Sequence, residues 1–259
     1  MPAPQFILDY TGQKYRESKH TEILNIDFDK YDTIIEPFGG SFGFSRYLHE
    51  KKGLTHLKYI IYDNDEDLIT FYKYFQSLII DNTHTDFINE YNQEVQKLKN
   101  ECQLETNINY LNFKKLKEFV QNYKHENIFI EYIMKKNHIS KGVARVCFKK
   151  NCGFLELMKS ATFIYSNFED IADDVLTDKK TFVYFDPPYI STDNTPYKNV
   201  NLHKTFEKMI KIYDTAQCLM VHQYNFLLSY VFKEYKQIEY DKIYGITNKK
   251  VKHVFFYNF

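Results

Sequence analysis

Tryptophan is absent from the sequence, and arginine occurs only at positions 16, 46 and 145. The formal net charge is zero, with 34 basic and 34 acidic residues, which excludes a uniformly basic coat and leaves room only for a local basic patch. The chain also has no apolar run of about twenty residues and no charged, apolar leader. We therefore expect a cytoplasmic protein that neither enters a membrane nor is secreted.

The four cysteines, Cys102, Cys147, Cys152 and Cys218, are too few and too widely spaced for a disulfide scaffold. Only Cys147 and Cys152 are close, and their spacing is not the usual one of a zinc pair. We expect no metal site and reduced thiols. The sequence has no internal repeat and no linker rich in proline, glycine or serine, and 259 residues suffice for one α/β domain with an insertion.

An apolar, β-branched and aromatic run from Thr181 to Phe185 stops at an acid, two prolines and a tyrosine. The run predicts a buried strand. Proline cannot extend a central ladder, so Pro187 and Pro188 leave backbone carbonyls pointing past the end of the sheet, at the edge where α/β folds bind ligands. The alternative is an ordinary proline turn with a solvated acid.

This corner suits methylation of an exocyclic amine, which is a poor nucleophile because its lone pair is delocalised into the ring. The carboxylate of Asp186 and the carbonyl of Pro187 can each accept one N–H hydrogen bond and so aim the nitrogen lone pair outward. Tyr189 offers an aromatic face for a base removed from its stack.

Three further segments predict a nucleotide-binding sheet. Residues 32–38 form a strand that leads into the glycine-rich turn 39–43 and a helix, where backbone can approach a ligand closely. Residues 58–63 form a second strand ending in Asp63, which can accept hydrogen bonds from both ribose hydroxyls of a nucleoside. Residues 162–170 form a short strand and a turn, in which Phe168 either stacks on a ligand or packs in the core.

The segment from residue 81 to residue 159 is polar, helical in pattern and locally basic. Residues 114–151 contain ten Lys or Arg against three Glu, interleaved with aromatic side chains. This combination suits phosphate contacts and base stacking, although a solvated helical face is the alternative. The basic candidates for DNA contact are Lys114, Lys115, Lys117, Lys135, Lys136, Lys141, Arg145, Lys149 and Lys150.

Together these motifs resemble the Dam-type, D12 class, α-group N6-adenine DNA methyltransferases over almost the whole chain. The signature of that family is Asp-Pro-Pro-Tyr, found here as Asp186, Pro187, Pro188 and Tyr189. The single-glycine element Thr11-Gly12-Gln13-Lys14 resembles the one that begins related phage enzymes. The resemblance implies S-adenosyl-L-methionine as cofactor, bound by Tyr10, Lys14, Phe38, Gly39, Gly40, Ser41, Asp63, Asn167, Phe168, Asp186 and Tyr197.

The resemblance also implies a Rossmann-like methyltransferase domain, residues 1–80 and 160–259, with an inserted, mostly helical target-recognition domain, residues 81–159. The expected activity is transfer of methyl from S-adenosyl-L-methionine to N6 of an adenine flipped out of double-stranded DNA. The insertion matches the family poorly, so the target sequence cannot be carried over. Two alternatives stay open: methylation of RNA adenine or another amine, and an inactive DNA-binding relative that acts as a scaffold.

Overall fold

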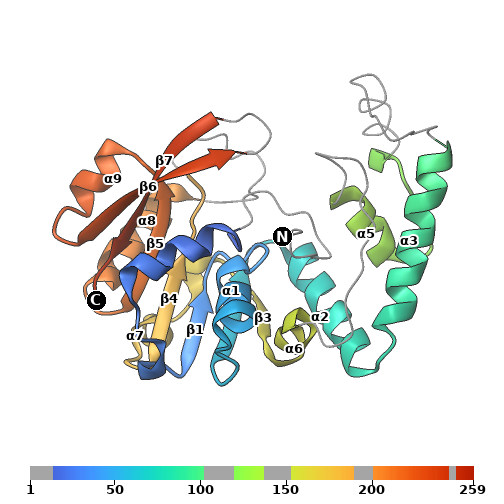
Figure 1. The fold of residues 1–259 in the computed structure, drawn as a ribbon, viewed down its shortest axis with the longest axis horizontal. Helices are drawn as coiled ribbons and strands as arrows, with labels where there is room; N and C mark the ends of the chain where they lie inside the picture. The colour runs from blue at the N-terminus through green and yellow to red at the C-terminus, as the bar shows by residue number, and fades with distance from the viewer. Residues whose placement is uncertain (1–13, 102–119, 137–152, 190–200, 245–248) are drawn as a thin grey trace. The chain divides into compact units, whose positions relative to one another are not determined.

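The computed structural model describes residues 14–101, 120–136, 153–189, 201–244 and 249–259 (Figure 1). The chain divides into two compact units. One, here called the sheet unit, comprises residues 14–72 and 160–259, and the other, the helical unit, includes residues 73–159.

The sheet unit is built on a seven-stranded sheet with the order β3-β2-β1-β4-β5-β7-β6. Strands β1 to β5 run parallel, whereas β7 is antiparallel to both β5 and β6. The strand bounds are Thr33–Glu36 for β1, Lys58–Asp63 for β2, Thr162–Tyr165 for β3, Thr181–Phe185 for β4, Gln217–Gln223 for β5, Lys236–Tyr244 for β6 and Lys249–Tyr257 for β7. The order reverses between β1 and β4, and in open α/β sheets ligands bind at the carboxyl ends of the strands where this reversal occurs.

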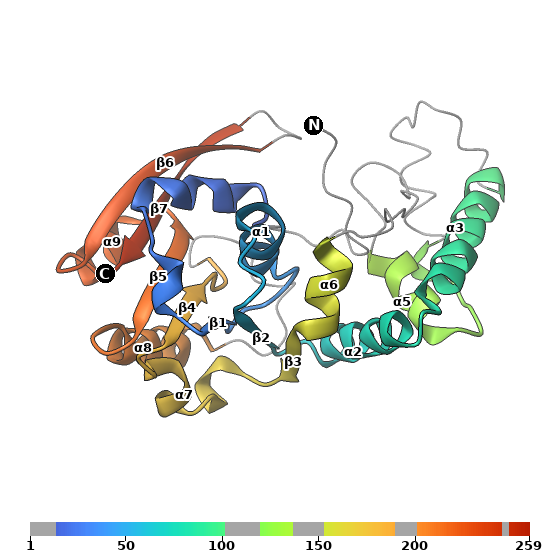
Figure 2. The ribbon, with the colours of Figure 1, turned by 60° about the horizontal axis from the view of Figure 1, so that its bottom comes forward.

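Helices lie on both faces of this sheet (Figure 2). One face carries the 3-10 helix η1 (Glu17–Leu24) and α1 (Gly43–Lys52), and the other carries α7 (Asp173–Thr177) and α8 (Leu202–Tyr213). The remaining elements are η2 (Phe28–Lys30), α2 (Glu66–Ile80), η3 (Phe168–Asp170) and α9 (Phe226–Val231), with α3 (His84–Glu101), α5 (Ile128–Lys136) and α6 (Gly153–Ser160) in the helical unit or at its boundary. The mixed sheet with helices on both faces is the Rossmann-like architecture that the sequence predicts.

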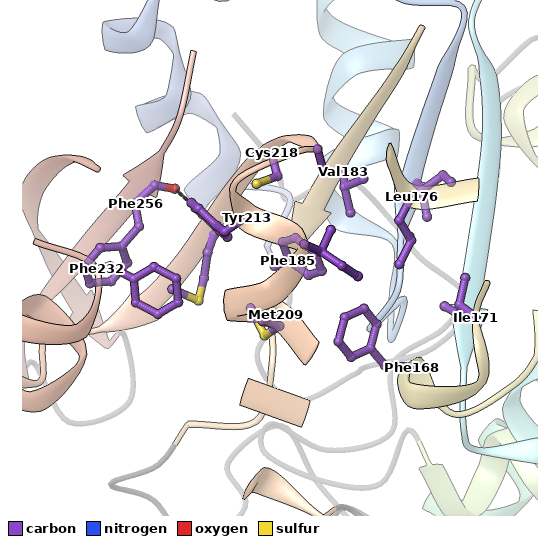
Figure 3. Close-up of a cluster of buried hydrophobic side chains, with 14 of the residues drawn as sticks. Phe168, Ile171, Leu176, Val183, Phe185, Met209, Tyr213, Cys218, Phe232 and Phe256 are labelled. Carbon is purple, nitrogen blue, oxygen red and sulfur yellow. Dashed lines mark hydrogen bonds between the residues drawn. The ribbon is translucent and has the colours of Figure 1, made fainter. Parts of the chain in front are cut away.

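Strand β4 lies in the middle of the sheet, and all five of its residues are buried. On the α1 face, the ring of Tyr184 stacks on that of Phe44 with centroids 4.1 Å apart. On the other face, Val183 and Phe185 join a cluster that includes Met209 of α8 (Figure 3). Each fully buried side chain of this size contributes about 1.5–3 kcal/mol, so the corner after β4 is anchored by its own strand.

Three elements are not evident from the sequence. Strand β6 was not predicted, and α9 ends at Val231 although apolar residues continue to Tyr235. Strand β6 lies at the sheet edge, and charged residues interrupt its apolar residues, so it lacks a strong apolar run. Two of these charged residues pair with β7, Asp241 with Lys250 at 2.8 Å and Glu239 with Lys252 at 2.7 Å. The charged run after residue 16 forms the 3-10 helix η1. None of the described helices combines the length and apolarity needed to cross a bilayer.

Candidate active site

Three acidic residues gather at the carboxyl edge of the sheet. Glu36 is the last residue of β1, Asp63 is the last residue of β2, and Asp186 directly follows β4. These strands are neighbours in the order β2-β1-β4 and run parallel, so their carboxyl ends lie side by side, with the reversal of strand order between β1 and β4.

The Asp-Pro-Pro-Tyr corner is held from outside the sheet by Lys14. Its Nζ lies 2.9 Å from Oδ1 of Asp186 and 5.1 Å from the centre of the Tyr189 ring. The Asp186 side chain is 19% exposed, whereas Pro187 and Pro188 are buried. The carboxylate therefore sits at the rim of the core, within reach of a ligand, while its position is fixed by a buried cation.

Burial raises the pKa of Asp186, and the ammonium of Lys14 opposes this by stabilising the carboxylate. For Lys14, burial lowers the pKa, but the negative charges of Asp186 and Glu17 outweigh it and leave the pKa well above its ordinary value. The lysine therefore stays charged. A carboxylate can accept several hydrogen bonds, so the contact of Lys14 with Oδ1 leaves Asp186 able to accept others.

Lys14 reaches this position because a glycine lets its backbone come close. A Cβ on Gly43, the first residue of α1, would lie 2.5 Å from the amide nitrogen of Tyr15 and 2.9 Å from that of Lys14. No real Cβ tolerates the first of these contacts with backbone. Gly43 thus allows the segment that carries Lys14 to lie against the start of α1.

The glycine-rich turn after β1 is tied to the end of β2. The amide of Gly40 donates to Oδ2 of Asp63 at 2.8 Å, and Oδ1 of Asp63 accepts from the amide of Asp65 at 2.9 Å. Gly40 has a φ of 47°, a left-handed conformation that glycine adopts without strain. A Cβ on Gly39 would meet Cγ2 of Ile61 at 2.3 Å, so only glycine allows the turn to pack this tightly on β2.

A hydrophobic wall stands beside this turn. The rings of Phe38 and Phe168 lie 5.2 Å apart, and Phe168 is buried. Asn167 is exposed and donates through Nδ2 to Asp170 at 2.9 Å. Ser41 is buried within the turn. All these residues belong to the sheet unit, with the turn, Asp63 and the Asp-Pro-Pro-Tyr corner at one edge of its sheet.

Glu36 was not singled out from the sequence, although it stands at the centre of this edge. It is fully buried, and its Oε1 accepts a hydrogen bond from the amide of Ser45 in the first turn of α1 at 2.7 Å. Burial raises its pKa to about 8. At neutral pH this group is therefore mostly protonated, unlike the carboxylate of Asp186 that Lys14 stabilises.

Sequence reasoning also missed a group of buried polar residues next to Lys14. Glu17 is the first residue of η1, and its side chain contacts Tyr240 and Lys242 of β6 and His253 of β7. In the sequence, Glu17 belongs to a charged run that resembles a solvated face. Only the alternation of the last two strands could have indicated that one of their faces is buried.

Several predicted site residues lie outside the described residues: Tyr10, Lys114, Lys115, Lys117, Lys141, Arg145, Lys149, Lys150 and Tyr197. Two predicted DNA contacts are described, both in the last turn of α5. Lys135 pairs with Glu131, and Lys136 lies 5.4 Å from the centre of the Tyr132 ring. In the described part of the chain no cluster of three or more His, Cys, Asp or Glu is arranged to hold a metal ion.

A Rossmann-like sheet with a glycine-rich turn, an acid at the end of β2 and Asp-Pro-Pro-Tyr after β4 defines an S-adenosylmethionine-dependent methyltransferase. Residues 10–254 match the D12 class N6 adenine-specific DNA methyltransferase family, so the chain belongs to that family. It is therefore an adenine-specific DNA methyltransferase, and its methyl donor is S-adenosyl-L-methionine.

Among solved structures, the chain is similar to an rRNA methylase from Streptococcus thermophilus, with 11% identity over 93% of this chain and 95% of that one. The TM-score of 0.39 is too low to carry an argument about function. No curated protein gave a significant match.

Proposed function

We propose that Asp186 and the carbonyl oxygen of Pro187 hold the N6 amino group of an adenine that has been extruded from double-stranded DNA. The observation that carries this proposal is the position of Asp186, directly after β4 where the strand order reverses, with its Oδ1 in contact with Lys14. The amino group has two N–H donors, and two fixed acceptors can take one each. Tyr189 gives the ring of the extruded base a face on which to stack.

Two acceptors prepare the nitrogen for attack. An amino group that donates both hydrogens to fixed oxygens favours a more tetrahedral nitrogen, and its lone pair then points away from Asp186. When bound, S-adenosylmethionine supplies an electrophilic methyl group on a sulfonium. The positive charge that develops on N6 is stabilised by the Asp186 carboxylate, and no covalent intermediate with the chain is needed.

The residues on the β2 side fit the cofactor. Both oxygens of Asp63 accept a backbone amide, and a carboxylate at the end of the second strand is the group type that accepts ribose hydroxyls in such sheets. Phe38 is half-buried and, backed by the buried Phe168, forms an apolar wall suited to an adenine ring, and Asn167 precedes Phe168 at an exposed position. We assign Gly39, Gly40 and Ser41 to the same site because they form the turn that Asp63 holds. The contact of Lys14 with the methyl donor stays a prediction.

We further propose that the insertion from residue 81 to residue 159 recognises duplex DNA. Its net positive charge supports phosphate contacts in a chain whose other residues are on balance acidic. Lys135 and Lys136 end α5, and the other basic candidates lie outside the described residues. If lysines of this segment bind phosphates, the affinity for DNA falls as the salt concentration rises.

The experiment that tests the proposal compares Asp186→Ala with Asp241→Ala, which removes an exposed acid paired with Lys250. Each protein is incubated with methyl-labelled cofactor and with duplex DNA, single-stranded DNA or RNA, and the nucleosides are then analysed. We expect N6-methyladenine in duplex DNA, a loss of at least about a thousandfold in Asp186→Ala, and wild-type activity in Asp241→Ala.

Binding of DNA, measured by fluorescence anisotropy, should remain within a few-fold of wild type in Asp186→Ala. Undiminished transfer by this variant would refute the role of Asp186. Methylation of RNA in preference to duplex DNA would instead overturn the assignment of the substrate strand.

A further inference from the structure

Glu17 is a buried acid that connects the Asp-Pro-Pro-Tyr corner to the last two strands. Its side chain is 4% exposed, and its Oε2 lies 2.6 Å from Nζ of Lys242 and 3.8 Å from Nζ of Lys14. Its Oε1 accepts from the hydroxyl of Tyr240 at 2.5 Å and contacts Nδ1 of His253 at 2.8 Å. A single carboxylate thus contacts four polar groups.

The formal charges of two carboxylates and two ammonium groups cancel in this cluster. Lys14 lies between Asp186 and Glu17, while Lys242 pairs with Glu17 on the opposite side. Glu17 is ionised because its hydrogen bond with His253 and the two lysines lower its pKa, although burial opposes this. A buried charge is tolerated only when it is paired and hydrogen-bonded, so each member depends on the others.

The rings around Tyr189 belong to the same neighbourhood. The centre of the Tyr189 ring lies 4.6 Å from that of His222 and 5.6 Å from that of His253. His253 contacts Glu17, and Lys14 contacts both Asp186 and the Tyr189 ring. A displacement of the Glu17 carboxylate would therefore reach both the acid and the proposed stacking ring.

We propose that Glu17 is a positioning residue for methyl transfer, which balances Lys14 and Lys242 so that Asp186 keeps a free acceptor for the adenine amino group. This inference rests on the function proposed for Asp186. Without the charge of Glu17, two lysines would share the single carboxylate of Asp186. Lys242 would then be drawn toward Asp186 and would compete with the amino group for its oxygens.

A structural role alone makes a different prediction. If Glu17 only fastens η1 to β6 and β7, its loss lowers stability, and removal of a second member of the cluster lowers it further. If charge balance is what matters, removal of Lys242 together with Glu17 restores neutrality around Asp186 and restores the rate. The two interpretations therefore predict opposite results when Lys242 is removed from Glu17→Gln: a further loss of stability for a structural role, and a recovery of rate for charge balance.

The test compares Glu17→Gln, Lys242→Met and the double variant Glu17→Gln/Lys242→Met with wild type. Glutamine preserves the shape of the side chain and can still accept from Tyr240. Glu22→Gln is the matched control, because Glu22 lies in the same helix and also contacts a tyrosine and a lysine, Tyr47 and Lys52, but its side chain is 56% exposed. The readouts are kcat at saturating cofactor and DNA, cofactor Kd and Tm.

We expect kcat to fall by about ten- to a hundredfold in Glu17→Gln, with cofactor Kd within a few-fold of wild type. The double variant should regain most of the lost rate, Lys242→Met alone should lose rate, and Glu22→Gln should keep it. A kcat near the wild-type value in Glu17→Gln, or a double variant no faster than Glu17→Gln, would overturn the inference.

If Glu17→Gln does not fold, the double variant and Lys242→Met decide. An active, folded double variant supports charge balance, whereas a folded but inactive one, or an unchanged Lys242→Met, contradicts it. Asp186→Ala, assayed alongside, separates this inference from the proposed function. Activity in that variant would remove the role of Asp186 itself, whatever Glu17→Gln does.

Discussion

Asp63 and Asp186 lie at the same edge of the sheet, at the ends of β2 and β4, yet their carboxylates are stabilised by different kinds of partner. Asp63 accepts hydrogen bonds from two backbone amides, those of Gly40 and Asp65, both within 23 residues of it in sequence. Asp186 is held by Lys14, whose own balance depends on Glu17 and Lys242. One acid is stabilised by local backbone and the other by ions from distant segments.

This difference has a functional meaning. Two backbone amides hold the Asp63 carboxylate, an arrangement that suits the proposed binding of a neutral ribose. An ion pair keeps Asp186 charged inside the protein, and that charge is what a developing cation on an amino nitrogen requires. The comparison predicts that changes near Asp63 affect cofactor affinity and that changes near Asp186 affect the rate of transfer.

Among the changes that test this difference between the two acids, Asp63→Asn is expected to have the largest effect, on the affinity for the cofactor. Asparagine has one acceptor oxygen, so the amide of Gly40 or that of Asp65 would face an NH2 group, and an unsatisfied buried donor costs about 1–3 kcal/mol. Cofactor Kd, measured by calorimetry, should rise about ten- to a hundredfold. Glu66→Gln, an exposed change in the first turn of α2, is the control and should bind normally.

If Asp63→Asn binds the cofactor as tightly as wild type, Asp63 does not determine cofactor affinity. A variant that binds normally but transfers slowly would place Asp63 with Asp186. Either result would break the comparison.

A smaller effect is expected from Glu36, the third acid of the edge, which is kept neutral rather than charged. Its folded pKa of about 8 lies above its ordinary value of 4.5, so between these pH values the folded state binds one more proton than the unfolded state. The stabilisation from neutral Glu36 is therefore fully present below pH 4.5 and is lost as the pH rises through 8.

Glu36→Gln should remove this dependence, because glutamine can still accept from the amide of Ser45. Urea unfolding of both proteins at pH 6.5 and pH 8 measures it. The pKa of His222 is lowered by burial to about 4, so within this window the group titrates only in the unfolded state, near its ordinary value of 6.5, and its contribution cancels because both proteins carry it. The stability of wild type relative to Glu36→Gln should fall by about 1–2 kcal/mol across the window. Parallel pH profiles would show that Glu36 is ionised in the folded protein.

The smallest effect is expected from Lys208 of α8, which supports the apolar wall on the Asp63 side. Its Nζ donates to the carbonyls of Glu169 and Ile171 and lies 5.2 Å from the centre of the Phe168 ring. Lys208→Met should raise cofactor Kd about three- to tenfold and leave kcat unchanged. Lys211→Met, which removes an exposed lysine on the same helix, should change neither quantity. A fall in kcat with unchanged cofactor Kd would contradict this, because it would place Phe168 with the groups that affect the rate of transfer and not with those that bind the cofactor.

Much of the fold was predictable because its strands are apolar runs with clear ends. Strands β2 and β4 match the expected residues closely, since each is a largely buried apolar run. Strand β6 was missed because it lies at the sheet edge and alternates charged with apolar residues. The end of helix α9 cannot be read from the sequence because Phe232 and Tyr235, which pack in or against the core after the helix ends, continue its apolar pattern.

The site was predictable only where it depends on neighbours in sequence. Gly39, Gly40 and Asp63 are recognised from a strand followed by a turn, and the structure joins them directly. The contact of Lys14 with Asp186 spans 172 positions, and Glu17 is buried only because β6 and β7 fold over it. Nothing in a local pattern distinguishes this acid from Glu22, which lies in the same helix and is exposed.

The most direct test of the central claim is a crystal structure of the protein with duplex DNA and S-adenosylhomocysteine. The account predicts an extruded adenine stacked on Tyr189, with N6 within hydrogen-bond distance of both the Asp186 carboxylate and the Pro187 carbonyl, and with Lys14 still on Asp186. An adenine whose amino group is held by other groups, away from Asp186, would contradict it.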